Sequence, residues 1–306
     1  MTHNKIELRE LRDFGQKFNA VFTFVQNNFK SFFKVIGLTV GPLTLIGGFF
    51  LGLIYLNLTN MISDLTGTGN SLESLNWIGK LILSYFFLGI ASLWMIIAVY
   101  SFMAEYESGN ENITIEAVWK RGKSKILPTF GFSILTMLAM IFFIVIIAVL
   151  PGNNGLMIFL KVTIVVVGFF YVLCTLSLVV PNMVIEDAGL FESIGRSFTL
   201  IRGKWWSTFV LAILMGIIAS FATVVFAIPL YIVMFVRMIM QTSGGEIFTV
   251  ICSCIYFLGY FLMTTLPMLA IGFQYFNLVE RKDGTGLLKK IDQLGKQVDT
   301  VNEGDF

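Results

Sequence analysis

Residues 195–236 read GRSFTLIRGKWWSTFVLAILMGIIASFATVVFAIPLYIVMFV, a basic segment with two tryptophans followed by an uncharged apolar run over 207–236. A helix needs about 20 mostly apolar residues to cross the hydrocarbon core of a bilayer. The run is therefore predicted to span a membrane. Arg202, Lys204 and the pair Trp205–Trp206 stand directly before it, and basic and aromatic residues at the end of a span are typical of the membrane–water interface.

The composition extends this interpretation to the whole chain. Of its 306 residues, 56% are hydrophobic and only 13% are charged, whereas a soluble domain carries about 25% charged residues. Six runs are long enough to cross a bilayer: residues 35–58, 77–103, 126–150, 156–180, 207–236 and 247–275. The sequence predicts an all-α membrane protein with six transmembrane helices. The net charge of only +2 suggests no polyanionic partner, so no nucleic acid is expected to bind.

The basic residues indicate how the spans are oriented. Nearly all Lys and Arg residues fall in 1–34, 104–125, 182–206 and 276–306, and few fall in the alternate connections 59–76, 151–155 and 237–246. Since loops rich in Lys and Arg stay in the cytoplasm, both termini are expected on the cytoplasmic side. No cleavable signal peptide is recognised before the first span, which is therefore expected to remain in the mature protein.

A weak internal repeat divides the chain. FTFVQNNFKSFF at 22–33 aligns with FTLIRGKWWSTF at 198–209, and IEAVWKRGKSKIL at 115–127 shares Arg-Gly-Lys with the latter. Each copy precedes a span. The alignment predicts three hairpins within one membrane domain, 1–275, each preceded by a cytoplasmic amphipathic segment. The units are 1–103, 104–181 and 182–275, and residues 276–306 form an amphipathic tail with Leu287, Leu288, Ile291, Leu294 and Val298 at helical spacing.

The first amphipathic segment has apolar residues on one helical face: Phe14, Phe18, Val21, Phe22, Val25, Phe29, Phe32 and Phe33. A helix with an aromatic face and basic residues opposite it is predicted to lie in the membrane interface. The predicted contacts with lipid or with a protein partner are Phe29, Lys30, Arg196, Arg202, Lys204, Trp205 and Trp206. Two interpretations stay open for them, namely ordinary anchoring of the next span and recognition of a specific lipid or partner.

Two further stretches resemble a known family. PNMVIEDAGLFESIGRSFTLIRGKWWSTF (181–209) and YFNLVERKDGTGLL (275–288) are similar to bacterial integral membrane proteins typified by the membrane domain attached to some glycerophosphoryl diester phosphodiesterases. The matching positions are Glu186, Gly189, Ser197, Leu200, Gly203, Trp206, Tyr275, Leu278, Arg281 and Gly284. Glu280 departs from the pattern, which often has a basic residue there. The resemblance implies a six-helix module in the bacterial cytoplasmic (inner) membrane and no phosphodiesterase activity, since that catalysis belongs to a separate barrel domain.

Catalytic and metal sites are not recognised in the sequence. The single histidine, His3, cannot form a cluster, and Cys174, Cys252 and Cys254 lie in apolar runs as expected of buried, inert thiols. No cofactor is predicted. The pair Glu186–Asp187 is interpreted as the acidic start of the following helix. No Asp or Glu lies within a span, which argues against a proton-coupled pump.

Lys80 and Lys161 stand near the outer ends of their spans. They are interpreted either as long side chains that reach the outer headgroups or as an anion contact on the outer leaflet. Small residues suggest closely approaching helices, within one chain or, as the alternative, in a dimer: Gly37, Gly41, Gly48, Gly52, Gly216 and Ser220.

Three hypotheses about function remain. The chain is expected to be a non-catalytic membrane protein that scaffolds or regulates an envelope or lipid-related process. The alternative is a transporter or exporter of a lipid-like or amphipathic molecule, and a membrane-embedded lipid enzyme is the third. Membrane lipids are the expected partners, together with an unidentified membrane or cytoplasmic protein.

Overall fold

The computed structural model describes residues 6–56, 71–110, 112–149, 154–240, 245–284, 286 and 288. Within these ranges the chain is helical and contains no strand. The helices are α1 (Phe14–Leu56), α3 (Ser71–Glu107), α4 (Ile115–Gly122), α5 (Ile126–Val149), α6 (Gly155–Leu176), α7 (Val179–Ile185), α8 (Leu190–Ile201), α9 (Trp205–Met240) and α10 (Glu246–Asp283).

Six of the helical stretches are long and apolar enough to cross a membrane, and they contain α1, α3, α5, α6, α9 and α10. The predicted all-α membrane fold with six spanning helices is confirmed. The spans pair along the chain as α1 with α3, α5 with α6, and α9 with α10.

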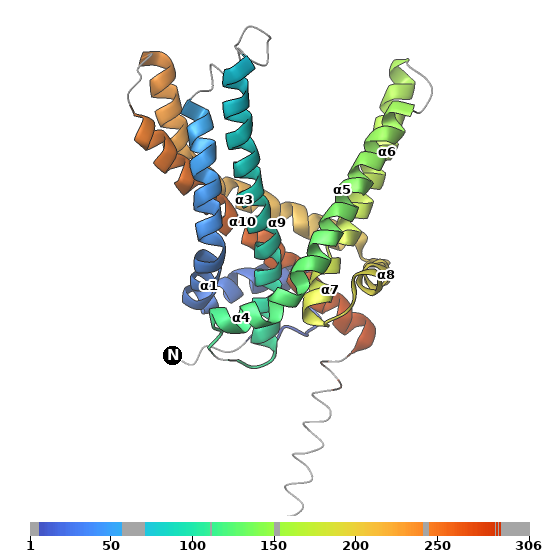
Figure 1. Cartoon of the computed structure of the whole chain (residues 1–306). Helices are drawn as coiled ribbons and strands as arrows, with labels where there is room; N and C mark the ends of the chain where they lie inside the picture. Colours follow the sequence, from blue (N-terminus) through green and yellow to red (C-terminus); the bar gives the residue numbers. More distant parts are fainter. Residues whose placement is uncertain are drawn as a thin grey trace, which may run out of the picture.

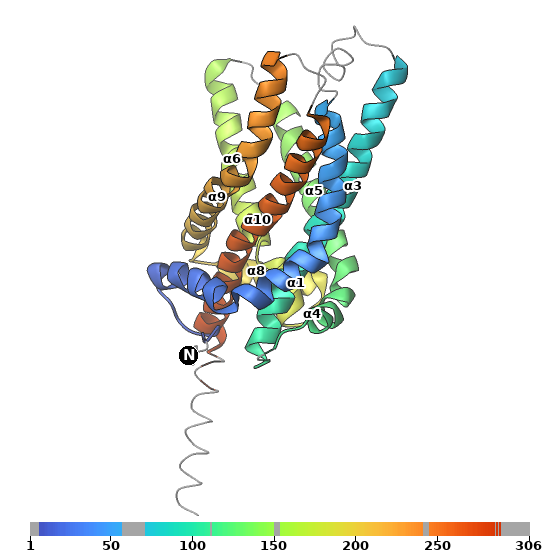
Figure 2. The same ribbon diagram turned by 90° about the vertical axis from the view of Figure 1, so that its left-hand side faces the viewer.

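The helices form two arms that join at one end (Figures 1 and 2). One arm contains α1, α3 and α10, with α9 packed along α10. The other is the α5–α6 hairpin, which leans away in Figure 1. Its side chains are apolar and mostly exposed, as expected of helices with lipid on several sides. We call the junction the basic end; it comprises residues 6–34, residues 102–107 at the end of α3, residues 115–125, residues 179–208 and the last three turns of α10.

The arm built on α1 and α10 depends on glycines that allow close backbone approach. A Cβ atom on Gly52 would lie 2.8 Å from Cα of Val250, and one on Gly48 would lie 3.1 Å from Cα of Cys254. At this contact the hydroxyl of Ser253 donates to the carbonyl oxygen of Gly48 at 2.9 Å. The predicted intramolecular role of small residues is confirmed at these two glycines.

The same prediction is wrong for Gly37 and Gly216, since nothing lies within 4 Å of a Cβ atom built on either glycine. A glycine pattern identifies a smooth helix face but does not identify the helix that covers it. Close approach is decided by which helices cross there.

Helix α10 is buried over three turns before it ends at the surface with Arg281–Asp283. Every residue over 269–280 is buried. The helix continues to Asp283, and its C-cap is Gly284, which has φ +63. Just after Tyr275, where the membrane domain is predicted to end, Phe276 and Leu278 pack in the same hydrophobic core as residues of α1 and α3. The predicted amphipathic helix beyond residue 288 lies outside the described residues.

The repeated segments adopt different local structures. Residues 22–33 lie within the continuous helix α1, whereas 198–209 break at Gly203, which has φ +75. Glycine adopts this left-handed conformation without the steric cost that a Cβ atom imposes. Asn27, the aligned residue in the first copy, stays helical. In 115–127, α4 passes through a short 3₁₀ turn at Lys123–Lys125 into α5, so the copies share a position before a span rather than a conformation.

Candidate functional site

An aromatic core holds the basic end together. Phe24 of α1 contacts Phe32, Phe102, Tyr106 and Phe273 edge-on, with ring centroids 5.0–6.4 Å apart. The prediction that the aromatic face of this segment lies in the membrane interface is therefore wrong for Val21 and Phe32, which are fully buried in the protein. Phe29 and Lys30, in contrast, are exposed. One helical face thus divides between protein core and surface because α3 and α10 cover only part of it.

Arg196 is held by two carboxylates. Its Nε atom lies 2.9 Å from Oε2 of Glu186 and its Nη2 atom lies 2.6 Å from Oδ2 of Asp283. Burial alone lowers the pKa of Arg196, but the hydrogen bonds to Asp283 and Glu186 outweigh it and raise that pKa above its usual value. Arg196 is one of the predicted contacts with lipid or a partner, and in the structure its guanidinium ties α8 to the ends of α7 and α10.

The acidic pair Glu186–Asp187 does not start the next helix. Helix α8 begins after Gly189 and has no side-chain cap. Asp187 has φ +59 and pairs with Lys125, while Glu186 pairs with Arg196. The hydrogen bond from Lys125 lowers the pKa of the Asp187 carboxyl. The helix-start interpretation is wrong because both carboxylates form ion pairs with basic side chains, Glu186 with Arg196 and Asp187 with Lys125, and neither caps α8.

Other carboxylates of the basic end are also paired. Glu107 of α3 pairs with Arg9, and Glu105 pairs with Arg121 at 2.6 Å. Arg9 also lies over the ring of Phe276, 5.9 Å from its centroid. These pairs hold the N-terminal segment and α4 against α3. They also leave fewer acidic side chains to balance the remaining cations.

Lys17 is the least expected member of the site, because it is only 3% exposed and forms no ion pair with any described residue. Its ammonium group donates to Oε1 of Gln274 at 2.7 Å and to Oγ of Ser207 at 3.2 Å. Nε2 of Gln274 in turn donates to Oγ1 of Thr208 at 2.8 Å. Lys17 therefore joins α1, α9 and α10 through neutral acceptors.

Two more cations stand around Lys17. Lys204 directly precedes α9, and Arg281 lies seven residues after Gln274 on α10. Both act electrostatically on Lys17, as does Asp13 with the opposite sign. Within the described part of the chain, neither Lys204 nor Arg281 forms an ion pair.

The tryptophan pair divides between two environments. Trp205 donates from Nε1 to the carbonyl oxygen of Tyr171 at 3.3 Å and stacks on Phe209 with ring centroids 4.8 Å apart. Trp206 is 71% exposed. Adjacent residues of a helix point in directions about 100° apart, since a turn contains 3.6 residues. Trp205 therefore packs the start of α9 against α6, while Trp206 and the exposed Arg202 face outward.

Lys80 and Lys161 do not form one site. Lys80 lies in α3 and Lys161 lies in α6, helices that belong to different arms (Figures 1 and 2). Both side chains are half-buried. Any contact of these lysines with anions is separate for each.

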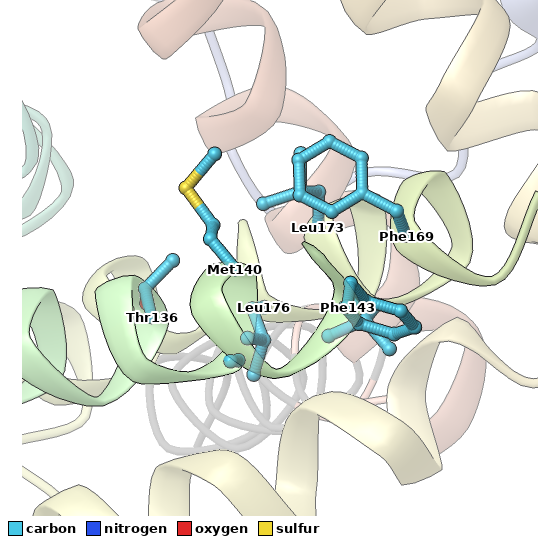
Figure 3. Close-up of a pocket in the computed structure, with 8 residues that line it drawn as sticks. Thr136, Met140, Phe143, Phe169, Leu173 and Leu176 are labelled. Atoms are coloured by element: carbon cyan, nitrogen blue, oxygen red, sulfur yellow. The ribbon is translucent and has the colours of Figure 1, made fainter. Parts of the chain in front are cut away.

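Cavities occur on both sides of α4. An apolar cavity of about 540 Å³ lies between α1, α3, α4 and α5, and its lining includes Leu43, Leu93, Trp94, Trp119 and Phe130. A polar cavity of similar volume, about 540 Å³, is lined by Glu105, Lys120, Arg121 and Asp187 among others. The crevice between α5 and α6 in Figure 3, near Met140 and Phe169, has a volume of only about 10 Å³, which is sufficient for about one water.

The sequence interpretation missed Lys17, Gln274 and Ser207 as a group. A signal was present, because Gln274 interrupts the last apolar run and Arg281 follows two helical turns later on the same face. Among the described residues, no three of His, Cys, Asp and Glu lie close enough to hold a metal. Cys174 is buried, and Cys252 and Cys254 are half-buried. Comparison with protein-family models, curated proteins and solved structures finds no match.

Proposed function

We propose that this chain is a non-catalytic multi-pass protein of the bacterial cytoplasmic membrane that scaffolds or regulates an envelope or lipid-related process through its basic end. Both termini lie in the cytoplasm, as the Lys- and Arg-rich segments favour. Negatively charged lipid surfaces or a protein partner supply the counter-charge. The resemblance to membrane domains of glycerophosphoryl diester phosphodiesterases agrees with this proposal and is part of it.

The observation that carries the proposal is that, among the described residues, more basic than acidic side chains of the basic end lack an ion-pair partner; the acidic ones are Asp13, Glu116 and Glu192. The acidic residues Glu105, Glu107, Glu186, Asp187 and Asp283 are each already paired. Several basic residues there form no ion pair with a described residue: Lys17, Lys30, Lys34, Lys120, Lys123, Arg202, Lys204, Arg281 and Lys282. Each Lys or Arg near an anionic membrane surface contributes about 1 kcal/mol of attraction. Such a face suits a lipid surface or an acidic partner.

Purification in a mild detergent, followed by mass spectrometry of proteins and lipids, tests the proposal. The expected result is an enriched anionic lipid or a stoichiometric protein partner that is lost when Arg202 and Lys204 are replaced by Gln. A chain that purifies alone, with lipids in the proportions of the bulk membrane, contradicts the proposal. Trp205 and Trp206 are kept in the variant, so insertion at the interface is preserved.

A second candidate function is transport or export of a lipid-like or amphipathic molecule. The apolar cavity between α1, α3 and α5 favours it, since about 540 Å³ falls within the usual range of ligand pockets. Its lining residues come from α1 and α3 of one arm and from α5 of the other. A membrane-embedded enzyme is not favoured by any contact of the described residues.

Filling the cavity separates the two candidates. Leu93→Trp introduces a large ring at the cavity wall, and Leu138→Trp adds the same ring at an exposed position of α5. If the chain moves a lipid through the cavity, a fluorescent-lipid assay in vesicles detects movement that Leu93→Trp abolishes and Leu138→Trp preserves. Equal rates with and without the wild-type protein eliminate the transport candidate.

A further inference from the structure

Lys17, Lys204 and Arg281 converge from three different segments. Lys17 is anchored to α9 through Ser207 and to α10 through Gln274. Lys204 is three residues before Ser207, and Arg281 is seven residues after Gln274. Gln274 and Arg281, seven positions apart in α10, share one helical face, and Lys204 directly precedes α9. Each anchor of Lys17 therefore has a second cation in its own segment.

The convergence is electrostatically unfavourable as it stands. A buried ammonium group normally has a carboxylate partner, whereas Lys17 has neutral acceptors and the two cations around it. Asp13 is the one carboxylate that acts on it, and its Oδ1 atom already accepts from the backbone N–H of Gln16 at 2.7 Å. An anion at this position offsets the repulsion.

The start of α9 adds backbone donors to the same place. Helix α9 begins at Trp205, and the first N–H groups of a helix have no partner within it. The positive end of the helix dipole favours negative charge there. Gly203, with φ +75, turns the chain just before these N–H groups. A Cβ atom built on Gly203 would have no other atom within 4 Å. The approach to the helix start is open at this residue.

We infer that Lys204, Arg281 and the N-terminus of α9, over the buried ammonium of Lys17, form a binding site for a phosphate group. Lys204 and Arg281 contact the anion directly, and Lys17 supplies charge from beneath while it positions Ser207. The exposed ring of Trp206 lies beside the site at the start of α9. The inference rests on the proposed function and deepens it, because it names a ligand for the basic residues that have no ion-pair partner. That ligand is a phosphate group, either of a lipid headgroup or of free inorganic phosphate.

The test uses the full-length protein in nanodiscs of phosphatidylcholine, with tryptophan fluorescence and the thermal midpoint as readouts. One arm titrates inorganic phosphate, and the other replaces a rising fraction of the lipid with phosphatidic acid. Saturable stabilisation is expected in one arm, and that arm identifies the source of the phosphate. The variants Lys204→Gln and Arg281→Gln each weaken it about tenfold, as expected for a hydrogen bond to a charged group.

Arg237→Gln is the matched control, because Arg237 lies in the last turn of α9, at the opposite end of that helix from the site. It keeps wild-type affinity if the site is specific. An equal loss in Arg237→Gln, or no saturable change in either arm, overturns the inference. A wild-type protein that co-purifies with an anionic lipid or a protein partner but shows no saturable phosphate binding overturns this site and leaves the proposed function standing, whereas a wild-type protein that purifies alone contradicts the proposed function.

Discussion

The Nζ atom of Lys17 lies 2.7 Å from Oε1 of Gln274, although 257 residues separate them in the chain. This contact joins α1 to α10 inside the basic end. Around it every residue over 269–280 is buried. The basic end is therefore a packed structure in which the positions of cations are determined by tertiary contacts.

Replacement of Arg196 by Gln is expected to destabilise the basic end. The change removes the ion pairs with Glu186 and Asp283, and all three side chains are partly exposed. The expected loss is about 1–2 kcal/mol, between the values for exposed and buried pairs. Thermal unfolding in nanodiscs measures it. Arg202→Gln, which removes a cation without an ion pair, is expected to leave the midpoint unchanged, and equal effects of both variants contradict the assigned role.

Gly52→Ala is expected to weaken the contact between α1 and α10. The added Cβ atom would lie 2.8 Å from Cα of Val250, and overpacking of this kind costs about 1–3 kcal/mol. Gly37→Ala is the control on the same helix, because nothing lies within 4 Å of its Cβ position. Alanine favours the helix over glycine by about 1 kcal/mol, so the control keeps or raises the thermal midpoint. A similar loss in both variants contradicts the packing.

The ion pair of Asp187 with Lys125 predicts a dependence of stability on pH. Lys125 lowers the pKa of Asp187 in the folded protein, so the stabilisation is complete above the unfolded pKa of about 3.9. It is lost as the pH falls through the lower folded value. The Asp187 side chain is 85% exposed, so the effect is below about 1 kcal/mol.

Asp187→Asn isolates that contribution. Asparagine tolerates the positive φ of this position, so the backbone is not strained by the change. The wild-type midpoint is expected to exceed that of the variant near neutral pH and to converge with it in acid. A difference that persists at the lowest pH shows that the carboxylate charge is not its source.

The orientation in the membrane is tested by cysteine labelling in a variant without the three native cysteines. Thr68→Cys, in a predicted outer loop beyond the described residues, is expected to react with an impermeant reagent on intact cells. Ser124→Cys, exposed at the basic end, is expected to react only after the membrane is opened. The reverse pattern shows that the termini face outward.

Two residues of the family resemblance, Glu186 and Tyr275, lie near Arg196 in the basic end. The resemblance itself stays a prediction.

The sequence by itself determined the all-helical class and the six apolar spans, because the length and hydropathy of a run follow from residues that are neighbours in the chain. Tertiary structure alone decided that Phe32 is core while Phe29 is surface, that Gly52 is covered while Gly37 is not, and that Lys17 is buried. In a membrane, lipid is about as apolar as a neighbouring helix. An apolar helix face in the sequence therefore does not show whether lipid or another helix covers it. That is decided by how α1, α3 and α10 cross in the folded protein.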